Sequence, residues 1–119
     1  MGIIGGIYHK NEKNVDRIEK DSIIKNIESF SFDSKGEWSD RNIFMTCYSK
    51  FITPESVNEK LPLIVEEAQV VIAADAIIDN RKELMDLLDI PLNKRKNIVD
   101  GYLIFLSYEK WGEDCPKYL

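Results

Sequence analysis

The stretch that decides the fold is VVIAADAIIDNRKEL, residues 70–84. The run from Gln69 to Ala74, which is apolar from Val70 onward, is typical of a strand that is covered on both faces. Residues 76–78, Ala-Ile-Ile, either continue this strand or form a second one that pairs with it. The first half of the stretch therefore predicts buried β-structure with a tight bend.

The second half of the stretch predicts a helix. Asn80 is followed three residues later by Glu83, which resembles a capping box: one side chain accepts from the first free N–H groups, and the glutamate bonds back. Apolar side chains then follow at helical spacing: Leu84, Leu87 and Leu88. The helix is expected to bury this stripe.

Strands and helices alternate only in part along the rest of the chain. Apolar and β-branched residues predict strands over residues 3–8 and 43–48. Polar, glycine-containing or proline-containing segments predict turns or loops, namely residues 9–14, 33–36 and 53–56. His9 is expected to lie exposed in the first of these turns. The short strands favour an α+β layered fold with mostly antiparallel strands.

Two further helices are predicted from apolar residues at helical spacing. The first covers about residues 16–29, and its apolar side is Val15, Ile18, Ile23, Ile24, Ile27 and Phe30. The second runs over about residues 99–110, with Trp111 in the core, and Gly112 can end it in a left-handed conformation.

Composition excludes several classes of protein. The chain has 119 residues and a net charge of −5, so phosphate attraction does not favour nucleic-acid binding, and the basic run 93–97 is interpreted as a solvated loop. No apolar run approaches the roughly 20 residues that span a bilayer, and no signal peptide is recognisable. We therefore expect a cytoplasmic protein without membrane contact. Cys47 and Cys115 are expected to be small buried or half-buried residues and not a disulfide, and two cysteines with one histidine make no zinc set.

Four segments in a fixed order resemble one family. They are IGGIY at residues 4–8, ITPES at 52–56, ADAIIDNRKEL at 74–84, and DGYLI at 100–104 followed by YEKWGEDC at 108–115. Together they resemble the N-terminal glutaminase domain of asparagine-synthetase-like enzymes, the class II glutamine amidotransferases with an Ntn-hydrolase fold. The residues of these segments most resemble the branch found in lasso peptide cyclases and β-lactam synthetases, where this domain has often lost glutaminase activity.

The resemblance implies the first half of an αββα layered sandwich. Residues 1–119 are expected to be a partial glutamine-amidotransferase-like domain that ends before the family's later strands. The synthetase domain, with its SGGxDS loop for ATP, is absent from this sequence, so ATP and magnesium are expected only in that domain. The expected partners are the remainder of the domain and a synthetase domain, or a second chain, a peptide substrate or another copy.

The family's nucleophile is a cysteine at the mature N-terminus, whose own α-amine acts as the base. The matching residue is Gly2, and a shift of one position does not bring a cysteine into place. Glycine has no side chain with which to attack a carboxamide. The resemblance therefore implies no catalytic residue in this chain and a domain that is inactive on its own.

The other pocket positions of the family are also altered. Tyr48 stands where an arginine holds the glutamine carboxylate, Asp75 and Ala76 replace the Asn-Gly oxyanion donors, and Ile77 replaces the glutamate that binds the substrate amine. A carboxylate at an oxyanion site would repel the developing negative charge. Asp100 matches the substrate-binding aspartate. Simpler interpretations stay open: Asp75 as a turn residue, and Asp100 as a helix N-terminal residue favoured by the helix dipole.

Three functional hypotheses follow. The first is a degenerate glutaminase-like part of an ATP-dependent ligase that forms amide bonds, with a peptide-modifying ligase of the lasso-cyclase type as one form of it. The second is a stand-alone peptide- or protein-binding module that pairs through exposed sheet edges. The third, an active glutamine-hydrolysing amidotransferase, is the least compatible with Gly2, Tyr48 and Asp75.

Overall fold

The computed structural model describes residues 2–119, and their contacts divide the chain into two units. The first unit contains the residues up to 51 together with residues 60–75. The second contains residues 52–59 and 76–119. The chain thus passes from the first unit to the second, back, and across again between Asp75 and Ala76.

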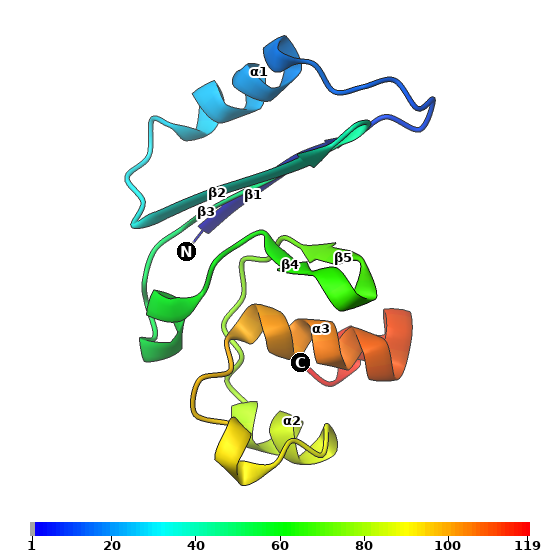
Figure 1. Cartoon of the computed structure of the whole chain (residues 1–119). Coiled ribbons are helices and arrows are strands. Elements are labelled where there is room, and N and C mark those ends of the chain that lie inside the picture. The colour runs from blue at the N-terminus through cyan, green and yellow to red at the C-terminus, as the bar shows by residue number, and fades with distance from the viewer. Residues whose placement is uncertain (1) are drawn as a thin grey trace. The chain divides into compact units, whose positions relative to one another are not determined.

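A three-stranded antiparallel sheet forms the centre of the first unit (Figure 1). Its strands lie in the order β1–β3–β2, with bounds β1 (Gly2–Tyr8), β3 (Ile43–Ser49) and β2 (Ser34–Asp40). The central strand carries the most deeply buried side chains of the sheet: Phe44, Thr46, Cys47 and Tyr48. The outer strands are only partly covered, as their position at the two edges requires.

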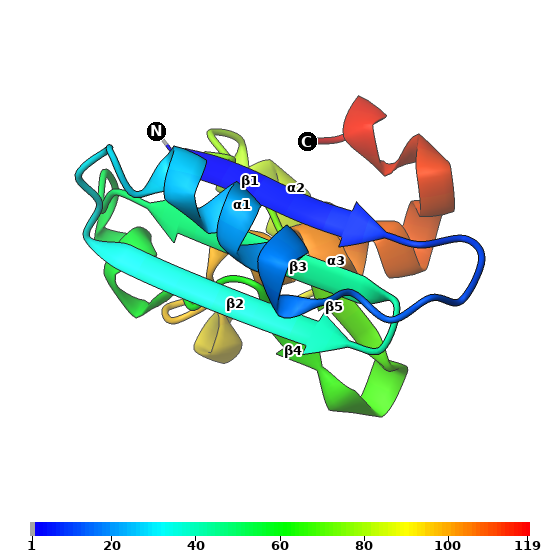
Figure 2. The ribbon, with the colours of Figure 1, turned by 90° about the horizontal axis from the view of Figure 1, so that it is seen from above.

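One face of the sheet is covered by α1 (Arg17–Ile27), which lies over β1 and β3 in Figure 2. Asp16 begins this helix with a complete capping box, in which its carboxylate accepts the Glu19 N–H and the Glu19 side chain accepts the Asp16 N–H. Gly5 permits the close approach, because a Cβ there would lie 3.0 Å from Cγ2 of Ile23. The side chains of Phe44, Thr46 and Tyr48 share this face by strand alternation.

The opposite face meets the segment that leads into a two-stranded hairpin, β4 (Leu63–Val65) and β5 (Val70–Ile72). The hairpin turns through η2 (Glu66–Ala68) and Gln69, which has a left-handed φ of 52°. A Cβ at Gly36 would lie 1.8 Å from the carbonyl oxygen of Leu61, so only glycine fits at this point of β2. The first unit therefore has three layers: a helix, a sheet and a hairpin (Figure 1).

The second unit is helical. It contains α2 (Arg81–Leu87) and α3 (Asp100–Trp111) with the short turns η1 (Pro54–Asn58), η3 (Leu92–Lys94) and η4 (Gly112–Lys117). Its core consists of Ile78, Leu84, Met85, Ile90 and Leu103, against which Trp111 packs. Trp111 also stacks on Tyr118 at 4.0 Å between ring centroids.

The predicted strands 3–8 and 43–48 are confirmed, but the sheet contains one strand that the sequence did not predict. Residues 34–36, expected in a turn, open β2 instead. The sequence of β2, SKGEWSD, is polar because it is an edge strand in which only alternate residues are covered. The second predicted strand, residues 76–78, is wrong: this segment has no regular structure, and Ile78 enters the helical core by itself.

The three predicted helices are confirmed with small changes of boundary, whereas several side chains lie elsewhere than expected. Ile18 and Leu87 are exposed, because each lies outside the buried side of its helix. The predicted cap at Asn80 is wrong: its side chain makes no cap hydrogen bond, and its Nδ2 donates to the carbonyl oxygen of Tyr118 at 2.9 Å. The prediction that His9 is exposed is also wrong: its side chain is half-buried, and its Nε2 lies 3.0 Å from Oε2 of Glu19.

The fold class is confirmed at its coarse level: the chain mixes helices with strands, and every strand pairing among residues 2–119 is antiparallel. Cys47 and Cys115 are both buried and are not joined in a disulfide, as predicted. The residues that the structure describes include no helix with the length and apolar character needed to cross a membrane.

Candidate functional site

The pocket residues inferred from the family resemblance divide between the two units. Gly2, Tyr48 and Asp75 belong to the first unit, and Ala76, Ile77 and Asp100 belong to the second. Each group therefore has its own geometry. We name them the Gly2 corner (Gly2, Tyr48 and Asp75) and the Arg81 cluster (Glu55, Glu59, Ile78, Arg81, Ile98, Asp100 and Gly101).

The Gly2 corner lies at the start of β1, where Gly2 pairs with Ser49. A Cβ placed on Gly2 would lie 3.0 Å from Oδ1 of Asp75 and 3.0 Å from the carbonyl oxygen of Tyr48. These separations are shorter than normal van der Waals contacts. The space beside Gly2 is therefore occupied by oxygen atoms, one of which belongs to a carboxylate.

Tyr48 contributes only its backbone to the Gly2 corner. Its ring lies on the helix-covered face of the sheet, edge-on to Phe32 at 5.6 Å between centroids, with Nζ of Lys35 5.4 Å from its own centroid. Burial raises the pKa of the Tyr48 hydroxyl, with smaller contributions from Glu37 and Glu28. Gly2 has the opposite strand parity, so the Tyr48 side chain and a side chain at position 2 would point to opposite faces.

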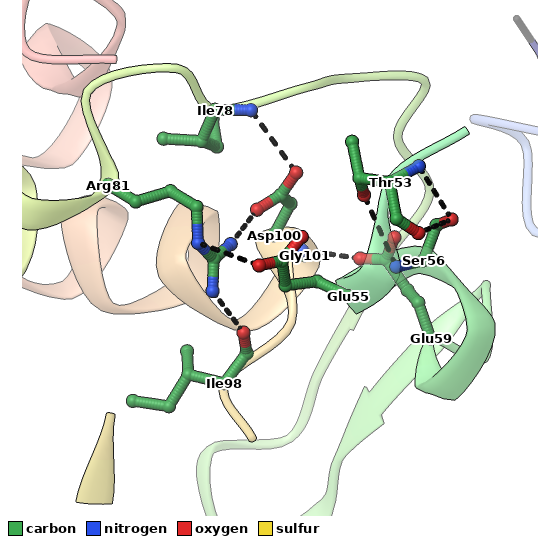
Figure 3. Close-up of polar contacts among 9 residues, drawn as sticks. All are labelled: Thr53, Glu55, Ser56, Glu59, Ile78, Arg81, Ile98, Asp100 and Gly101. Atoms are coloured by element: carbon green, nitrogen blue, oxygen red, sulfur yellow. Dashed lines mark hydrogen bonds and ion pairs between the residues drawn. The ribbon is translucent and has the colours of Figure 1, made fainter. Parts of the chain in front are cut away.

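The Arg81 cluster is built around the carboxylate of Asp100, which is buried at the first residue of α3 (Figure 3). Oδ2 accepts the backbone N–H of Ile78 at 3.1 Å, and Oδ1 accepts a hydrogen bond from Nη1 of Arg81. Both carboxylate oxygens thus have partners within the protein. Such pairing is what a buried carboxylate requires in order to stay charged.

Arg81 extends the cluster to two other segments. Its Nη2 donates to the carbonyl oxygen of Ile98, and its Nε lies 3.9 Å from Oε1 of Glu55 (Figure 3). The planar guanidinium can make these contacts at once because its donors point in fixed, divergent directions. One side chain therefore connects η1, the start of α2 and the segment that precedes α3.

The Glu59 side chain also contacts the N-terminus of α3. Its Oε1 accepts the backbone N–H of Gly101 at 2.6 Å, which satisfies one of the free donors of the helix. Burial raises the pKa of Glu59, and the nearby Asp100 charge raises it further, while the Gly101 N–H and Arg81 act in the opposite direction. The carboxylates of Asp100 and Glu59 thus converge on one helix terminus, and Arg81 pairs with Asp100.

The segment ITPES folds as a small capped turn next to this cluster. Ser56 donates its backbone N–H to Oγ1 of Thr53 at 3.3 Å, and its hydroxyl donates to the Thr53 carbonyl at 2.6 Å (Figure 3). The N–H groups of Ile52 and Thr53 donate in turn to the Ser56 hydroxyl. These bonds fix the direction in which Glu55 and Glu59 leave the turn.

The sequence missed the principal member of this cluster. Arg81 and Glu55 stand inside two of the quoted family segments, yet neither was assigned a role, and Glu59 follows the first segment. The available signal was an arginine, Arg81, at the start of one expected helix and an aspartate, Asp100, at the start of another. Ala76 and Ile77 are both exposed and take no part in the polar contacts of the cluster.

Comparison of the chain with models of protein families, with curated proteins and with solved structures gave no significant match. The resemblance to asparagine-synthetase glutaminase domains therefore stays a prediction from the sequence segments. Within residues 2–119, no group of three or more His, Cys, Asp or Glu side chains is placed to hold a metal ion.

Proposed function

We propose that this chain is a degenerate glutaminase-like domain of an asparagine-synthetase-like, ATP-dependent ligase that forms amide bonds, of the peptide-modifying type. In this proposal the domain does not hydrolyse glutamine and serves as a folded support for a synthetase domain. The observation that carries the proposal is the Gly2 corner, where Asp75 Oδ1 stands 3.0 Å from the Cβ position of residue 2.

A carboxylate at this place opposes the chemistry of a glutaminase. The reacting species would be a thiolate on the side chain of residue 2, and a neighbouring negative charge raises the pKa of a thiol and disfavours its ionisation. The tetrahedral intermediate of amide hydrolysis also carries a negative oxygen, which needs hydrogen-bond donors. The Tyr48 carbonyl and the Asp75 carboxylate, the atoms that crowd this position, are both acceptors.

The surroundings of Asp100 support a structural role for the second group of residues. A carboxylate that holds a substrate amine must present at least one oxygen to the ligand. Both oxygens of Asp100 accept hydrogen bonds from the protein, and the residue is only 6% exposed. These contacts favour a role of Asp100 in holding the fold together over a role in binding a ligand.

The absence of glutaminase activity is tested with the purified full chain and three variants. We expect no glutamate from glutamine with the wild type, and no covalent adduct by mass spectrometry with a diazoketone analogue of glutamine. Gly2→Cys should stay inactive, because Asp75 remains beside the thiol. Asp75→Asn alone should also stay inactive, because it has no thiol at position 2. Any glutamate formed by the double variant Gly2→Cys/Asp75→Asn is compared with this single variant as the control. Glutamate production by the wild type above a protein-free control would overturn the proposal.

The link to a ligase needs a separate test. The proposal requires an ATP-binding SGGxDS segment in the coding sequence that continues from this chain or in an adjacent gene. The encoded synthetase domain should lose solubility or amide-forming activity when this chain is deleted, and it should keep both with Asp75→Asn, because the Asp75 side chain is exposed. A synthetase domain that is equally active without the chain would contradict the supporting role.

A further inference from the structure

The two edges of the three-stranded sheet differ in how they are protected. The edge strand β2 carries Lys35, Glu37 and Asp40, and charges on an edge strand discourage pairing with other chains. The other edge strand, β1, has the sequence GIIGGIY, with no charge and no proline over seven residues. Figure 2 shows β1 along one margin of the sheet, with β3 on its inner side only.

The backbone direction of β1 follows from its pairing with β3. The His9 N–H donates to the Asn42 carbonyl, and the register pairs Ile7 with Phe44, Gly5 with Thr46 and Ile3 with Tyr48. Hydrogen-bonded pairs recur at every second residue of an antiparallel ladder, so these odd-numbered residues face β3. The N–H and C=O groups of the even-numbered residues therefore point outward from the sheet, namely Gly2, Ile4, Gly6 and Tyr8.

The same residues leave an apolar strip on the face that α1 does not cover. Ile4 is 52% exposed and Tyr8 is 63% exposed, and Gly6 between them is exposed as well. Outward hydrogen-bonding groups and exposed apolar side chains thus coincide on one strand. A strand with these properties is a template for the addition of another strand.

We infer that β1 pairs antiparallel with β1 of a second copy of this chain, with Gly5 on the two-fold axis. The register that overlaps all seven residues sets Gly2 opposite Tyr8, Ile3 opposite Ile7 and Ile4 opposite Gly6. In this register the outward-pointing residues meet one another as hydrogen-bonded pairs, which gives about eight backbone hydrogen bonds across the two-fold axis. The result is a continuous six-stranded sheet.

The side chains of β1 complement themselves in this register. On the face away from α1, each large residue meets a glycine of the second copy: Tyr8 meets Gly2, next to which the exposed Asp75 carboxylate lies, and Ile4 meets Gly6. On the face that α1 covers, Ile3 meets Ile7, a β-branched pair of the kind that stabilises antiparallel sheets. A two-fold interface requires a surface that is complementary to itself, and β1 meets this requirement in the register above. Because β1 carries no charge, it has no means of selecting an acidic or a basic peptide, which favours a second copy as the partner.

Sedimentation equilibrium of the full chain over a range of concentrations tests this pairing. We expect a monomer–dimer equilibrium, and Ile4→Lys should raise the dimer dissociation constant by about tenfold or more, because the two lysines would lie diagonally across the axis, about 7–8 Å apart. The matched control is Ile64→Lys, which changes an isoleucine of the same unit with 51% exposure and should leave the constant within about twofold. A wild type that stays monomeric, or equal effects of the two variants, would overturn the pairing.

Hydrogen exchange of the wild type locates the interface without a substitution and covers the case in which Ile4→Lys does not fold. The amides of Ile4, Gly6 and Tyr8 should exchange more slowly as the protein concentration rises. The amides of Lys35 and Glu37 on the charged edge should exchange at a rate that does not depend on concentration. Exchange at β1 that is independent of concentration would overturn the inference.

Discussion

The Gly2 corner and the Arg81 cluster each contain an aspartate for which the sequence resemblance predicts a pocket role, and the two aspartates have opposite surroundings. Asp75 is exposed beside Gly2, and none of the ion pairs among residues 2–119 includes it. Asp100 is buried, and an arginine and a backbone N–H satisfy it. Two aspartates at predicted pocket positions thus differ in the structure: one is exposed beside a glycine, and the other is buried and paired.

The comparison predicts that the Arg81 cluster stabilises the protein more than any group in the Gly2 corner. Arg81→Met should lower the free energy of unfolding by about 3 kcal/mol, because it leaves the Asp100 charge buried without its partner. Urea unfolding followed by circular dichroism measures this loss. Lys82→Met, on the adjacent exposed position of α2, is the control and should change stability by less than about 0.5 kcal/mol.

Close backbone packing in the first unit should rank second. Gly36→Ala places a Cβ 1.8 Å from the Leu61 carbonyl oxygen, so the strand or the following segment must move, at a cost of about 2 kcal/mol. Glu37→Ala, an exposed position of the same strand, is the control for side-chain removal without overlap. Equal unfolding midpoints for the two variants would show that the contact between Gly36 and Leu61 does not constrain the fold.

The two aspartates themselves give the most direct comparison. Asp100→Asn keeps one acceptor oxygen but loses the charge that Arg81 meets, and we expect a loss of about 1.5 kcal/mol. Asp75→Asn should change the free energy of unfolding by less than about 0.5 kcal/mol, because its carboxylate is exposed. A larger loss with Asp75→Asn than with Asp100→Asn would reverse the roles assigned to the two regions.

The smallest effect is expected from pH. The pKa of Glu59 is raised in the folded state above its ordinary value of 4.5, so the folded protein binds the proton more tightly than the unfolded chain. This stabilising contribution is complete below pH 4.5 and is lost as the pH rises through the folded-state pKa. Glu59→Gln should remove that part of the pH dependence, which unfolding curves at pH 4 and pH 7 can detect. A wild type and a variant with parallel pH profiles would contradict the shift.

Regular local patterns made much of the fold predictable. The capped helix that begins at Asp16, the central strand 43–48 and the helix that ends before Gly112 each carry their own signal of capping, β-branching or apolar spacing. The edge strand β2 could not be predicted, because about half of its residues face solvent. Its first residues, Ser-Lys-Gly, are also common in turns and loops. Its extended conformation depends on hydrogen bonds to β3, and residue patterns within β2 itself do not reveal this pairing.

The sequence by itself determined the α+β class, the antiparallel tendency, the two buried thiols and the lack of a side chain at Gly2. Only the tertiary structure decided that Asp75 meets Gly2, that Tyr48 turns to the other face, and that Arg81 joins Asp100 to Glu55. The reason is physical: propensity and periodicity act between neighbours in the chain. The partner of a charge or of a close backbone approach, in contrast, is set by the packing of segments that lie tens of residues apart.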